Sequence, residues 1–257
     1  GILQSTGTNL TNLSTYYNRR YFSMRKLLAF LLSLAIILCP ILSAPALALE
    51  DNLPFDDVSD NHWARGAIAW AHEQGLTSGT GPRTFSPQKT ITRAMFYMML
   101  YSLEGRPAPV EEVELRYRDV PPNAYYRDAL QWAASTGMID WRGVNFYPNE
   151  PITREDLAEA LFSYENHYRT TYYPELPEWT LAEPAPFPSQ YTDVDRDPDH
   201  CWAMRIIVSY GIMAGRTSTT LAPRGSSTRA EAVFMIWKMY HYLQDVYSKY
   251  DTPEGES

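Results

Sequence analysis

The sequence predicts a mainly α-helical protein built from three copies of one helix–loop–helix repeat. An Asp-Val pair opens each copy, and a glycine follows its aspartate 18 residues later. A proline stands six residues before an arginine in every copy. Two independent spacings kept at three places indicate an internal repeat. The matched positions are Asp57, Asp119 and Asp193; Gly75, Gly137 and Gly211; Pro87, Pro148 and Pro223; and Arg93, Arg154 and Arg229.

The first helix of the first copy is predicted from the spacing of its apolar residues. Trp63, Ala67 and Ala71 recur at four-residue steps, which is typical of an amphipathic helix. Gly75 supplies the left-handed residue that closes many helices. A loop and an extended Phe-Ser-Pro segment then follow. A second helix is expected to begin at Arg93 and to carry the next apolar run.

The same order recurs in the other two copies, so most of the chain can be divided into repeats. We expect the repeats at 54–104, 117–168 and 190–243. A proline-rich connector at 169–189 separates the second and third copies, and its composition favours a stiff, extended segment. A polar tail is expected at 244–257.

The beginning of the sequence has the composition of a secretory signal. Residues 24–48 combine a short basic start, an apolar run at 27–38 and a small-x-small cleavage pattern, which predicts a signal peptide. The apolar run is shorter than the roughly 20 residues that a membrane-spanning helix needs. We therefore expect no integral membrane protein after cleavage. Residues 1–23 are expected to be an upstream extension that is not translated or is disordered.

Charge and reactive residues exclude several classes of function. Residues 49–257 keep 18 of the 22 basic residues and all 30 acidic ones, a net charge of −12. Such an acidic chain is not expected to bind nucleic acid or an anionic membrane. The five histidines show no metal-ligand spacing, so neither a metal nor a cofactor is predicted. Cys201 is expected to be a small core residue, and no enzyme motif appears.

With these motifs in view, residues 54–243 resemble three tandem S-layer homology (SLH) domains. The repeat of that family has an aromatic-x-Asp-Val element, a Trp-Ala helix start, a Gly-x-x-x-Gly turn, an aromatic-x-Pro segment and an Ile-Thr-Arg-Ala-Glu ending. The first copy here has Phe55-Asp56-Asp57-Val58, Trp63-Ala64, Gly75 to Gly79, Phe85-Ser86-Pro87 and Ile91-Thr92-Arg93-Ala94.

The resemblance implies both a fold and a function. It implies three repeats packed around a pseudo-three-fold axis and non-covalent attachment to a bacterial cell wall. Grooves between the repeats would bind secondary cell-wall polysaccharide, often pyruvylated, or a peptidoglycan-linked polymer. We therefore expect a secreted, carbohydrate-binding, non-catalytic protein of the cell surface. Two alternatives stay open: a surface-layer or scaffold component that self-associates, and a small wall hydrolase with its site in the proline-rich segment.

The resemblance also implies which residues contact the ligand. The arginine of the family's closing motif corresponds to Arg93, Arg154 and Arg229, and its glutamate to Glu231, with Asp156 as a shorter stand-in and Met95 uncharged. The tryptophan at the helix start is Trp63 in the first copy and Tyr125 or Tyr126 in the second, and its register around Trp202 in the third stays open.

Physical chemistry separates the members of this closing motif. Ser or Thr three residues before Glu forms a capping box at a helix start. Thr228 and Glu231 fit that box fully, whereas Thr153 fits it in part and Thr92 through its own side chain alone. Capping does not require arginine, and a positive charge at the first helical position opposes the helix dipole. An anionic ligand would offset this placement, because guanidinium binds a carboxylate in a planar fork.

The alternative for each arginine is an ion pair between repeats with Asp57, Asp119 or Asp193, which are therefore also candidate groove residues. Among the tryptophans, Trp63 and Trp141 lie near helix ends and loops and are the better candidates for stacking on a sugar. Gly79 and Gly215 are expected to serve tight turns with positive φ or to let a ligand approach the backbone.

Overall fold

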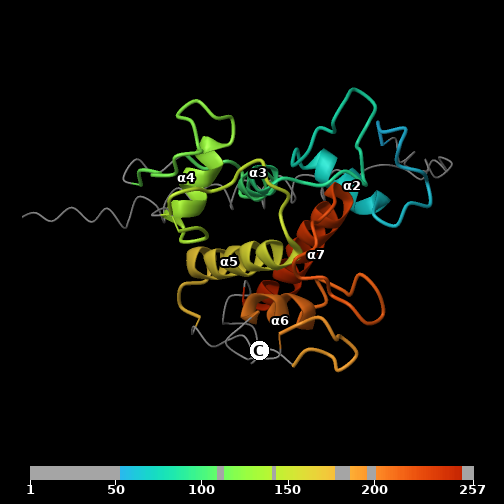
Figure 1. The fold of residues 1–257 in the computed structure, drawn as a ribbon. Coiled ribbons are helices and arrows are strands. Elements are labelled where there is room, and N and C mark those ends of the chain that lie inside the picture. The colour runs from blue at the N-terminus through green and yellow to red at the C-terminus, as the bar shows by residue number, and fades with distance from the viewer. Residues whose placement is uncertain (1–52, 109–112, 141–142, 177–185, 196–200, 251–257) are drawn as a thin grey trace, which may run out of the picture. The chain divides into compact units, whose positions relative to one another are not determined.

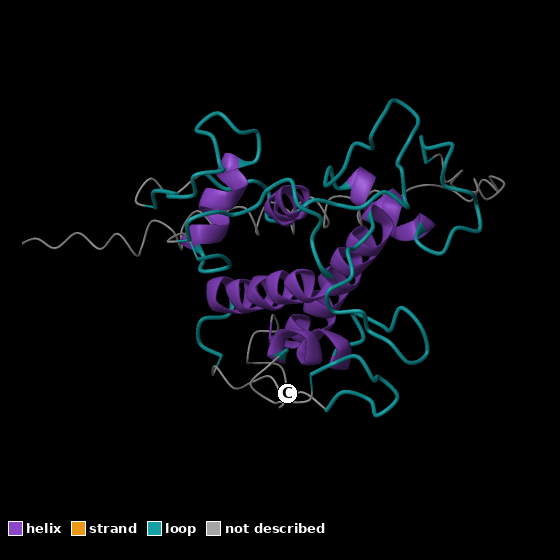
Figure 2. Cartoon of the chain, in the orientation of Figure 1, coloured by secondary structure: helices purple, strands orange, loops and turns teal. Residues whose placement is uncertain are grey.

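A computed structural model describes residues 53–108, 113–140, 143–176, 186–195 and 201–250. These residues form six α-helices and one short 3₁₀ helix, and among them the only strand pairing consists of isolated β-bridges (Figure 2). The prediction of a mainly α-helical protein is therefore confirmed. The helices are α2 (Arg65–Glu73), α3 (Arg93–Leu103), α4 (Arg127–Ser135), α5 (Arg154–Tyr172), α6 (Trp202–Ser209), α7 (Arg229–Tyr247) and η1 (Ser248–Tyr250).

Contacts divide the chain into two units, residues 1–50 and 51–257, and every described residue belongs to the second. The predicted upstream extension at 1–23, the signal peptide at 24–48, Trp141 and the last seven residues of the tail lie outside the described residues. So does 177–185, the middle of the predicted connector.

The second helix of each repeat begins where the sequence predicts. Helices α3, α5 and α7 start at the arginine of the closing motif, and the preceding threonine accepts a hydrogen bond from the backbone N–H three residues later. The Oγ1–N distances are 3.3 Å for Thr92–Met95, 3.1 Å for Thr153–Asp156 and 3.2 Å for Thr228–Glu231. Only α7 has the full capping box, in which Glu231 also accepts from the Thr228 backbone N–H at 2.8 Å. The capping predictions are confirmed in all three copies.

The first helix of each repeat ends at the predicted glycine. Gly75, Gly137 and Gly211 have φ values of 69°, 77° and 68°, and each follows directly on the last residue that caps its helix. A side chain disfavours this left-handed conformation, whereas glycine adopts it freely. The chain therefore turns out of the helix at the same point in every repeat.

The principal helix packing lies between repeats. Helix α2 of the first repeat packs on α7 of the third, α4 of the second on α3 of the first, and α6 of the third on α5 of the second (Figure 1). The first and second α-helices of one repeat are not among the pairs with extensive contact. A repeat in the sequence is thus not a packed helical hairpin, because each first helix buries its apolar face on the preceding repeat.

Backbone hydrogen bonds join the three repeats in a closed cycle. The Ile91 N–H donates to Ser227 O at 3.0 Å, Ile152 N–H to Ile91 O at 3.0 Å, and Ser227 N–H to Ile152 O at 2.9 Å. All three residues are fully buried, so the bonds are shielded from water. The cycle supports a pseudo-three-fold axis, which itself stays a prediction.

Two helices extend past the predicted repeat boundaries. Helix α5 continues to Tyr172, four residues into the segment predicted as connector, and α7 continues to Tyr247, into the predicted tail. Buried tyrosines account for both extensions. Tyr247 of α7 and Tyr173, just after α5, stack with ring centroids 4.8 Å apart, and both are buried. The two long helices also contact each other directly.

Candidate functional site

The three arginines occupy equivalent positions at the junctions between repeats. Each is the first residue of its helix, and its Nε donates to a backbone carbonyl of the next repeat in the cycle. The partners are Phe146 O for Arg93 at 3.0 Å, Leu221 O for Arg154 at 2.7 Å and Phe85 O for Arg229 at 2.9 Å. We name these the 1–2, 2–3 and 3–1 junctions. The carbonyl bonds explain why an arginine is tolerated at a helix start.

The ionic partners of the arginines differ from the expected ones. Arg93 Nη1 lies 3.0 Å from Asp156 Oδ2, and Arg154 Nη1 lies 3.7 Å from Glu231 Oε1. The sequence-based alternative of ion pairs with the Asp-Val aspartates is wrong at these two junctions. Each acid stands three residues after the cap of the next repeat's second helix. The third residue at that position is Met95, so the 3–1 junction has no such carboxylate.

The Asp-Val aspartates hold the backbone of their own repeats. Each carboxylate accepts hydrogen bonds from two successive N–H groups of the aromatic-x-Pro segment, as a bidentate clamp. The distances are 2.8 and 2.7 Å from Asp57 to Phe85 and Ser86, 2.8 and 2.7 Å from Asp119 to Phe146 and Tyr147, and 2.9 and 2.7 Å from Asp193 to Leu221 and Ala222. All three belong to the predicted site, and their contact with a ligand stays a prediction.

The clamp holds a strained residue in each repeat. Ser86, Tyr147 and Ala222 have φ values of 60°, 59° and 52°, in the left-handed region that non-glycine residues rarely adopt. Such a residue persists where the surroundings fix it, and here the aspartate accepts its N–H. At Asp193, burial alone would raise the carboxyl pKa. The N–H donors of Leu221 and Ala222 outweigh that effect, so the pKa of Asp193 lies below its usual value.

Glu231 is occupied by three partners within the protein. Besides capping α7 and facing Arg154, its two oxygens lie 2.9 and 3.0 Å from Arg216 Nη2. Asp156 has Arg93 as its ionic partner and is more exposed. These two acids, predicted as ligand contacts, therefore compensate arginines at the 1–2 and 2–3 junctions.

The aromatic residues before the first helices expose large apolar surfaces. Trp63 is 55% exposed and Tyr125 is 67% exposed, whereas Tyr126 is buried. Tyr125 is therefore the counterpart of Trp63, in agreement with its spacing from the Asp-Val pair. The Trp63 ring packs edge-on against Phe234 of α7, with centroids 5.1 Å apart, which places Trp63 at the 3–1 junction. Trp202 is also exposed, at the start of α6.

Gly79 and Gly215 occupy equivalent turns for different physical reasons. Gly79 has a φ of 84°, as predicted, and a Cβ there would lie 2.6 Å from the Phe55 ring. Gly215 is not among the glycines with positive φ, so that prediction was wrong for it. A Cβ at Gly215 would lie 2.4 Å from Thr217 O and 2.6 Å from the Tyr191 ring. Close approach by these groups requires glycine at this position.

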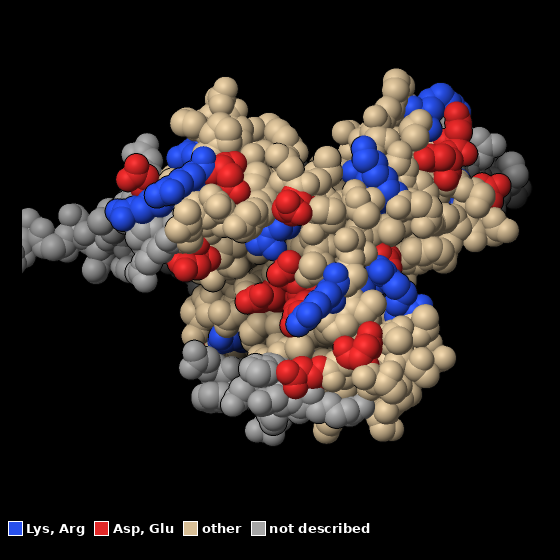
Figure 3. All heavy atoms as spheres, in the orientation of Figure 1, with Lys and Arg blue, Asp and Glu red and all other residues tan. Residues whose placement is uncertain are grey.

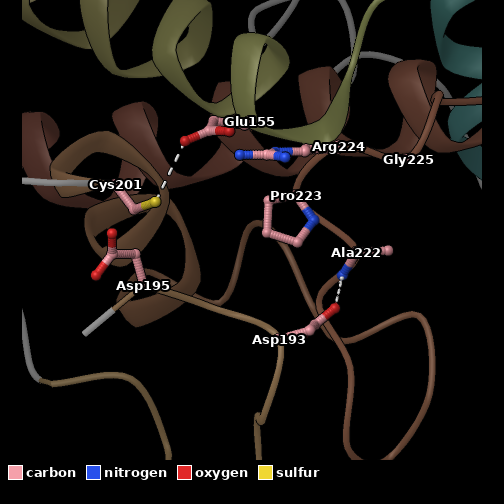
Figure 4. A pocket seen from close by; sticks show the side chains of 8 residues that line it. All are labelled: Glu155, Asp193, Asp195, Cys201, Ala222, Pro223, Arg224 and Gly225. Atoms are coloured by element: carbon pink, nitrogen blue, oxygen red, sulfur yellow. Dashed lines mark hydrogen bonds between the residues drawn. The ribbon is translucent and has the colours of Figure 1, made fainter. Parts of the chain in front are cut away.

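A pocket of about 700 Å³ opens at the 2–3 junction (Figure 4). It lies at a position where the third repeat differs from the other two. Arg65 and Arg127, eight residues after the aspartates of the first two Asp-Val pairs, donate from Nη1 to the valine carbonyls of those pairs. In the third repeat the same spacing gives Cys201, a much smaller side chain. The pocket is lined by Glu155, Asp193, Asp195, Cys201, Ala222, Pro223, Arg224 and Gly225.

Carboxylates dominate the charge of this pocket. Figure 4 shows Glu155 and Asp195 on either side of Cys201, with Arg224 beside Glu155. The Cys201 thiol donates to Glu155 Oε1 at 3.2 Å. Burial, together with that acceptor, raises the pKa of Cys201 to about 11, which disfavours a nucleophilic thiolate. Cys201 is half-buried and precedes α6 in a left-handed conformation, so it lies at a pocket edge and not in the core. The sequence reasoning missed this pocket, although the eight-residue spacing carries the signal.

Two features are absent from the described part of the chain. Within it, no group of three or more His, Cys, Asp or Glu side chains is placed to hold a metal ion. None of its helices combines the length and apolar character that a bilayer crossing requires. On the face drawn in Figure 3, acidic and basic side chains lie next to one another.

Comparisons with known proteins find the same three repeats. The model of the S-layer homology domain matches residues 54–94, 116–158 and 190–233. Exoglucanase XynX of Acetivibrio thermocellus is 30% identical over 197 residues, which are 75% of this chain and 17% of that protein. A cellulosome-anchoring protein of the same species is 33% identical over 133 residues, 49% of this chain and 30% of that protein. An S-layer protein of Bacillus thuringiensis subsp. finitimus is 26% identical over 184 residues, 72% of this chain and 21% of that protein.

The chain thus spans less than a third of the length of each of these relatives. Their names describe an enzyme, an anchoring protein and a surface-layer protein. A segment common to proteins of such different kinds is typical of a module with one general task.

Proposed function

This chain belongs to the S-layer homology family, and from that premise we propose that it attaches itself non-covalently to a bacterial cell wall. The proposed ligand is secondary cell-wall polysaccharide, including its pyruvylated forms, bound in the grooves at the junctions between repeats. The repeats themselves are the binding module and carry no catalytic role. Secretion through the signal peptide at 24–48 is part of the proposal.

The observation that carries the proposal is the match of three S-layer homology domains across the described chain. The comparisons support a place at the bacterial cell surface, because the relatives include an anchoring protein and an S-layer protein. A common attachment task also explains why the same region occurs in an exoglucanase. On this proposal, the catalytic activity of the exoglucanase belongs to the remaining 83% of that enzyme.

The junctions offer the chemistry that a sugar polymer needs. Exposed Trp63, Tyr125 and Trp202 provide flat apolar faces for the C–H surfaces of sugar rings. In the 2–3 pocket, Glu155 and Asp195 are hydrogen-bond acceptors and Arg224 is a donor, which suits hydroxyl groups. We propose that this pocket contacts uncharged parts of the polymer, because three carboxylates around one arginine repel an anion.

Co-sedimentation with purified wall sacculi tests the proposal. We expect the chain to sediment with intact sacculi and to stay in solution once the secondary polymer has been stripped from them. Equal sedimentation with stripped sacculi would exclude the polysaccharide as ligand. The paired change Trp63→Ala and Tyr125→Ala should weaken binding at least tenfold while leaving the helical circular dichroism intact, because both rings are exposed. Val144→Ala, at another exposed apolar side chain, is the control.

A further inference from the structure

Helix α7 carries a row of aromatic rings on one of its faces. Phe234 and Trp237 stack with ring centroids 5.7 Å apart, and the His241 ring meets Trp237 edge-on at 4.7 Å. Phe234 and Trp237 are half-buried and His241 is exposed. Residues three, four and seven positions apart share one face of a helix, so these rings form a strip along its surface. We name Phe234, Trp237, Lys238, His241 and Asp245 the α7 strip.

The fold alone does not require this strip, as the equivalent helix of the second repeat shows. Counted from the arginine that begins each helix, Phe234 corresponds to the exposed Glu159 of α5. His241 corresponds to the exposed Asn166, whereas Trp237 has an aromatic counterpart. Helix α5 thus carries polar groups at two positions where α7 carries rings. A continuous row of partly exposed rings is typical of a surface that contacts another molecule.

The charges of the α7 strip are arranged in a self-complementary order. Lys238 and Asp245 are seven residues apart, so they lie on the same face of the helix, about 10 Å from each other along its axis. Lys238 Nζ lies 5.4 Å from the centre of the Phe234 ring and donates to Gly211 O at 2.6 Å, and Asp245 is exposed. A two-fold axis beside His241 would bring Lys238 of each copy against Asp245 of the other. A patch that matches itself in this way is what an isologous dimer requires.

We infer that the α7 strip is a dimerisation surface, on which α7 of a second copy packs in antiparallel orientation. Trp237 and His241 form the apolar centre of the contact, because aromatic rings are enriched at the centres of protein interfaces. Lys238 and Asp245 of the two copies form an ion pair at each end of it. A neutral glycan would match the rings of the strip but not its ordered charges. The inference does not rest on the proposed function, because no wall polymer takes part in the contact.

The length of the α7 strip sets the strength of the dimer. The strip covers about 17 Å of helix. A contact of that length on one helix from each copy is smaller than the interface of a permanent dimer. We therefore expect dimers at high protein concentration, and where many copies lie side by side on one surface.

Exchange of the two charges tests the inference. Lys238→Glu and Asp245→Lys each place like charges opposite each other, so either change should weaken dimerisation at least tenfold. The double variant should dimerise like the unchanged protein, although it still lacks the Lys238 hydrogen bond to Gly211 O. Thr170→Lys adds a lysine at the position of α5 that corresponds to Asp245 and is the matched control. The measurement is the molar mass of the full chain by light scattering, up to about 1 mM, because weak complexes form in that range.

The outcomes of the charge exchange are distinct. Residues 1–48 are present in every variant, so a difference between variants is due to the substituted helix. Helical circular dichroism checks that each variant is folded. A monomer at every concentration of the unchanged protein would overturn the inference, and so would a double variant that dimerises no better than the single ones.

Cross-linking gives a second measurement that does not depend on charge. In a background with Cys39→Ser and Cys201→Ser, a short bis-maleimide should join His241→Cys to a second copy, because the two-fold axis passes beside this residue. Asn166→Cys, at the equivalent exposed position of α5, is the control and should stay uncoupled. Equal coupling of the two variants would contradict the proposed contact.

The wall polymer is the alternative occupant of the α7 strip, and co-sedimentation with sacculi separates the two. At protein concentrations below those at which dimers form, Asp245→Lys should sediment with sacculi as the unchanged protein does. Weaker sedimentation of this variant, together with a monomeric unchanged protein, would assign the strip to the polymer and overturn the inference. Failure of the unchanged protein to bind sacculi would instead refute the proposed function, with the molar masses still deciding the dimer.

Discussion

At the scale of single residues, the same side chains that resemble a ligand site also hold the repeats together. Asp119 clamps two successive backbone N–H groups, and Arg154 donates to a carbonyl 67 residues away in the sequence. Removing either side chain would leave backbone groups without partners, at a cost of about 1–3 kcal/mol for a buried group such as the Leu221 carbonyl and less for an exposed one. A substitution at either residue would therefore change folding as well as binding, so a loss of binding could not be assigned to a lost ligand contact. Exposed Trp63 is a better probe of a ligand.

Glu165 of α5 is a buried acid outside the proposed site. It has no exposed surface, and its Oε1 accepts from the Tyr247 hydroxyl at 2.5 Å, while its Oε2 has no hydrogen-bond partner. Burial raises the pKa of Glu165 above its usual value, and the Tyr247 hydrogen bond and the charge of Arg169 offset that only in part. The folded protein thus retains this proton at pH values where the unfolded chain has lost it.

Stability should accordingly depend on pH through Glu165. A raised folded-state pKa contributes fully below the unfolded pKa of about 4.3 and is lost as the pH rises toward the folded-state value. Glu165→Gln stays neutral and should lack this loss. We expect the variant to exceed the unchanged protein in free energy of unfolding at pH 8 and to be close to it at pH 4.5. Urea titrations at both pH values measure the difference, and parallel pH profiles would contradict the assignment.

At the scale of the helices, the second helices start alike but are anchored unequally. Thr92, Thr153 and Thr228 all cap their helices. The third residue of the helix then decides what else the helix start does: Met95 makes no ion pair, Asp156 makes one, and Glu231 makes two besides closing the capping box. A helix start in this fold is therefore also a contact between repeats.

Substitutions at this third position should differ in cost. Glu231→Ala leaves Arg154, whose side chain is 4% exposed, without its carboxylate, and the loss should be about 3–5 kcal/mol. Asp156→Ala removes the ionic partner of Arg93, whose side chain is 23% exposed, and should lower the free energy of unfolding by about 1 kcal/mol or less. Urea midpoints of the two variants give the comparison. Equal midpoints would mean that the ion pair at the 2–3 junction does not contribute through burial.

At the scale of the whole molecule, the three repeats form a closed cycle and not an open array. In an open array each repeat contacts only its neighbours along the chain, and stability is close to a sum over repeats. Here α7, the last α-helix of the described chain, packs on α2, the first one. Arg229 donates a hydrogen bond to the carbonyl of Phe85, 144 residues away in the sequence. Every repeat thus depends on both others.

Removing the third repeat should therefore unfold more than that repeat. A chain ending at residue 176 lacks α6 and α7, so both α2 and α5 lose their packing partners. We expect this fragment to lose the near-ultraviolet circular dichroism of packed aromatic rings and to unfold without a cooperative transition. A chain ending at Tyr250 keeps all six α-helices and is the control. Cooperative unfolding of the shorter fragment, with about two thirds of the enthalpy, would indicate an open array instead.

The sequence by itself determined the repeat, the starts of the second helices, the ends of the first helices, and the family. These features depend on residues a few positions apart. Thr228 caps the N–H three residues on, and Gly75 closes its helix, whatever the rest of the chain does. Local rules of this kind can be read from one sequence, and the structure confirms them in each copy.

Only the tertiary structure decided which helices pair and which charges meet. The partner of Arg154 is Glu231 and not an Asp-Val aspartate, because closure of the cycle brings together these two residues, which are 77 positions apart in the sequence. The same closure explains why an uncharged residue at Met95 matters. The arginine at that junction, Arg229, belongs to another repeat and is buried. Pairing over such distances depends on how the apolar faces of all three repeats are buried together, and no local pattern in the sequence records it.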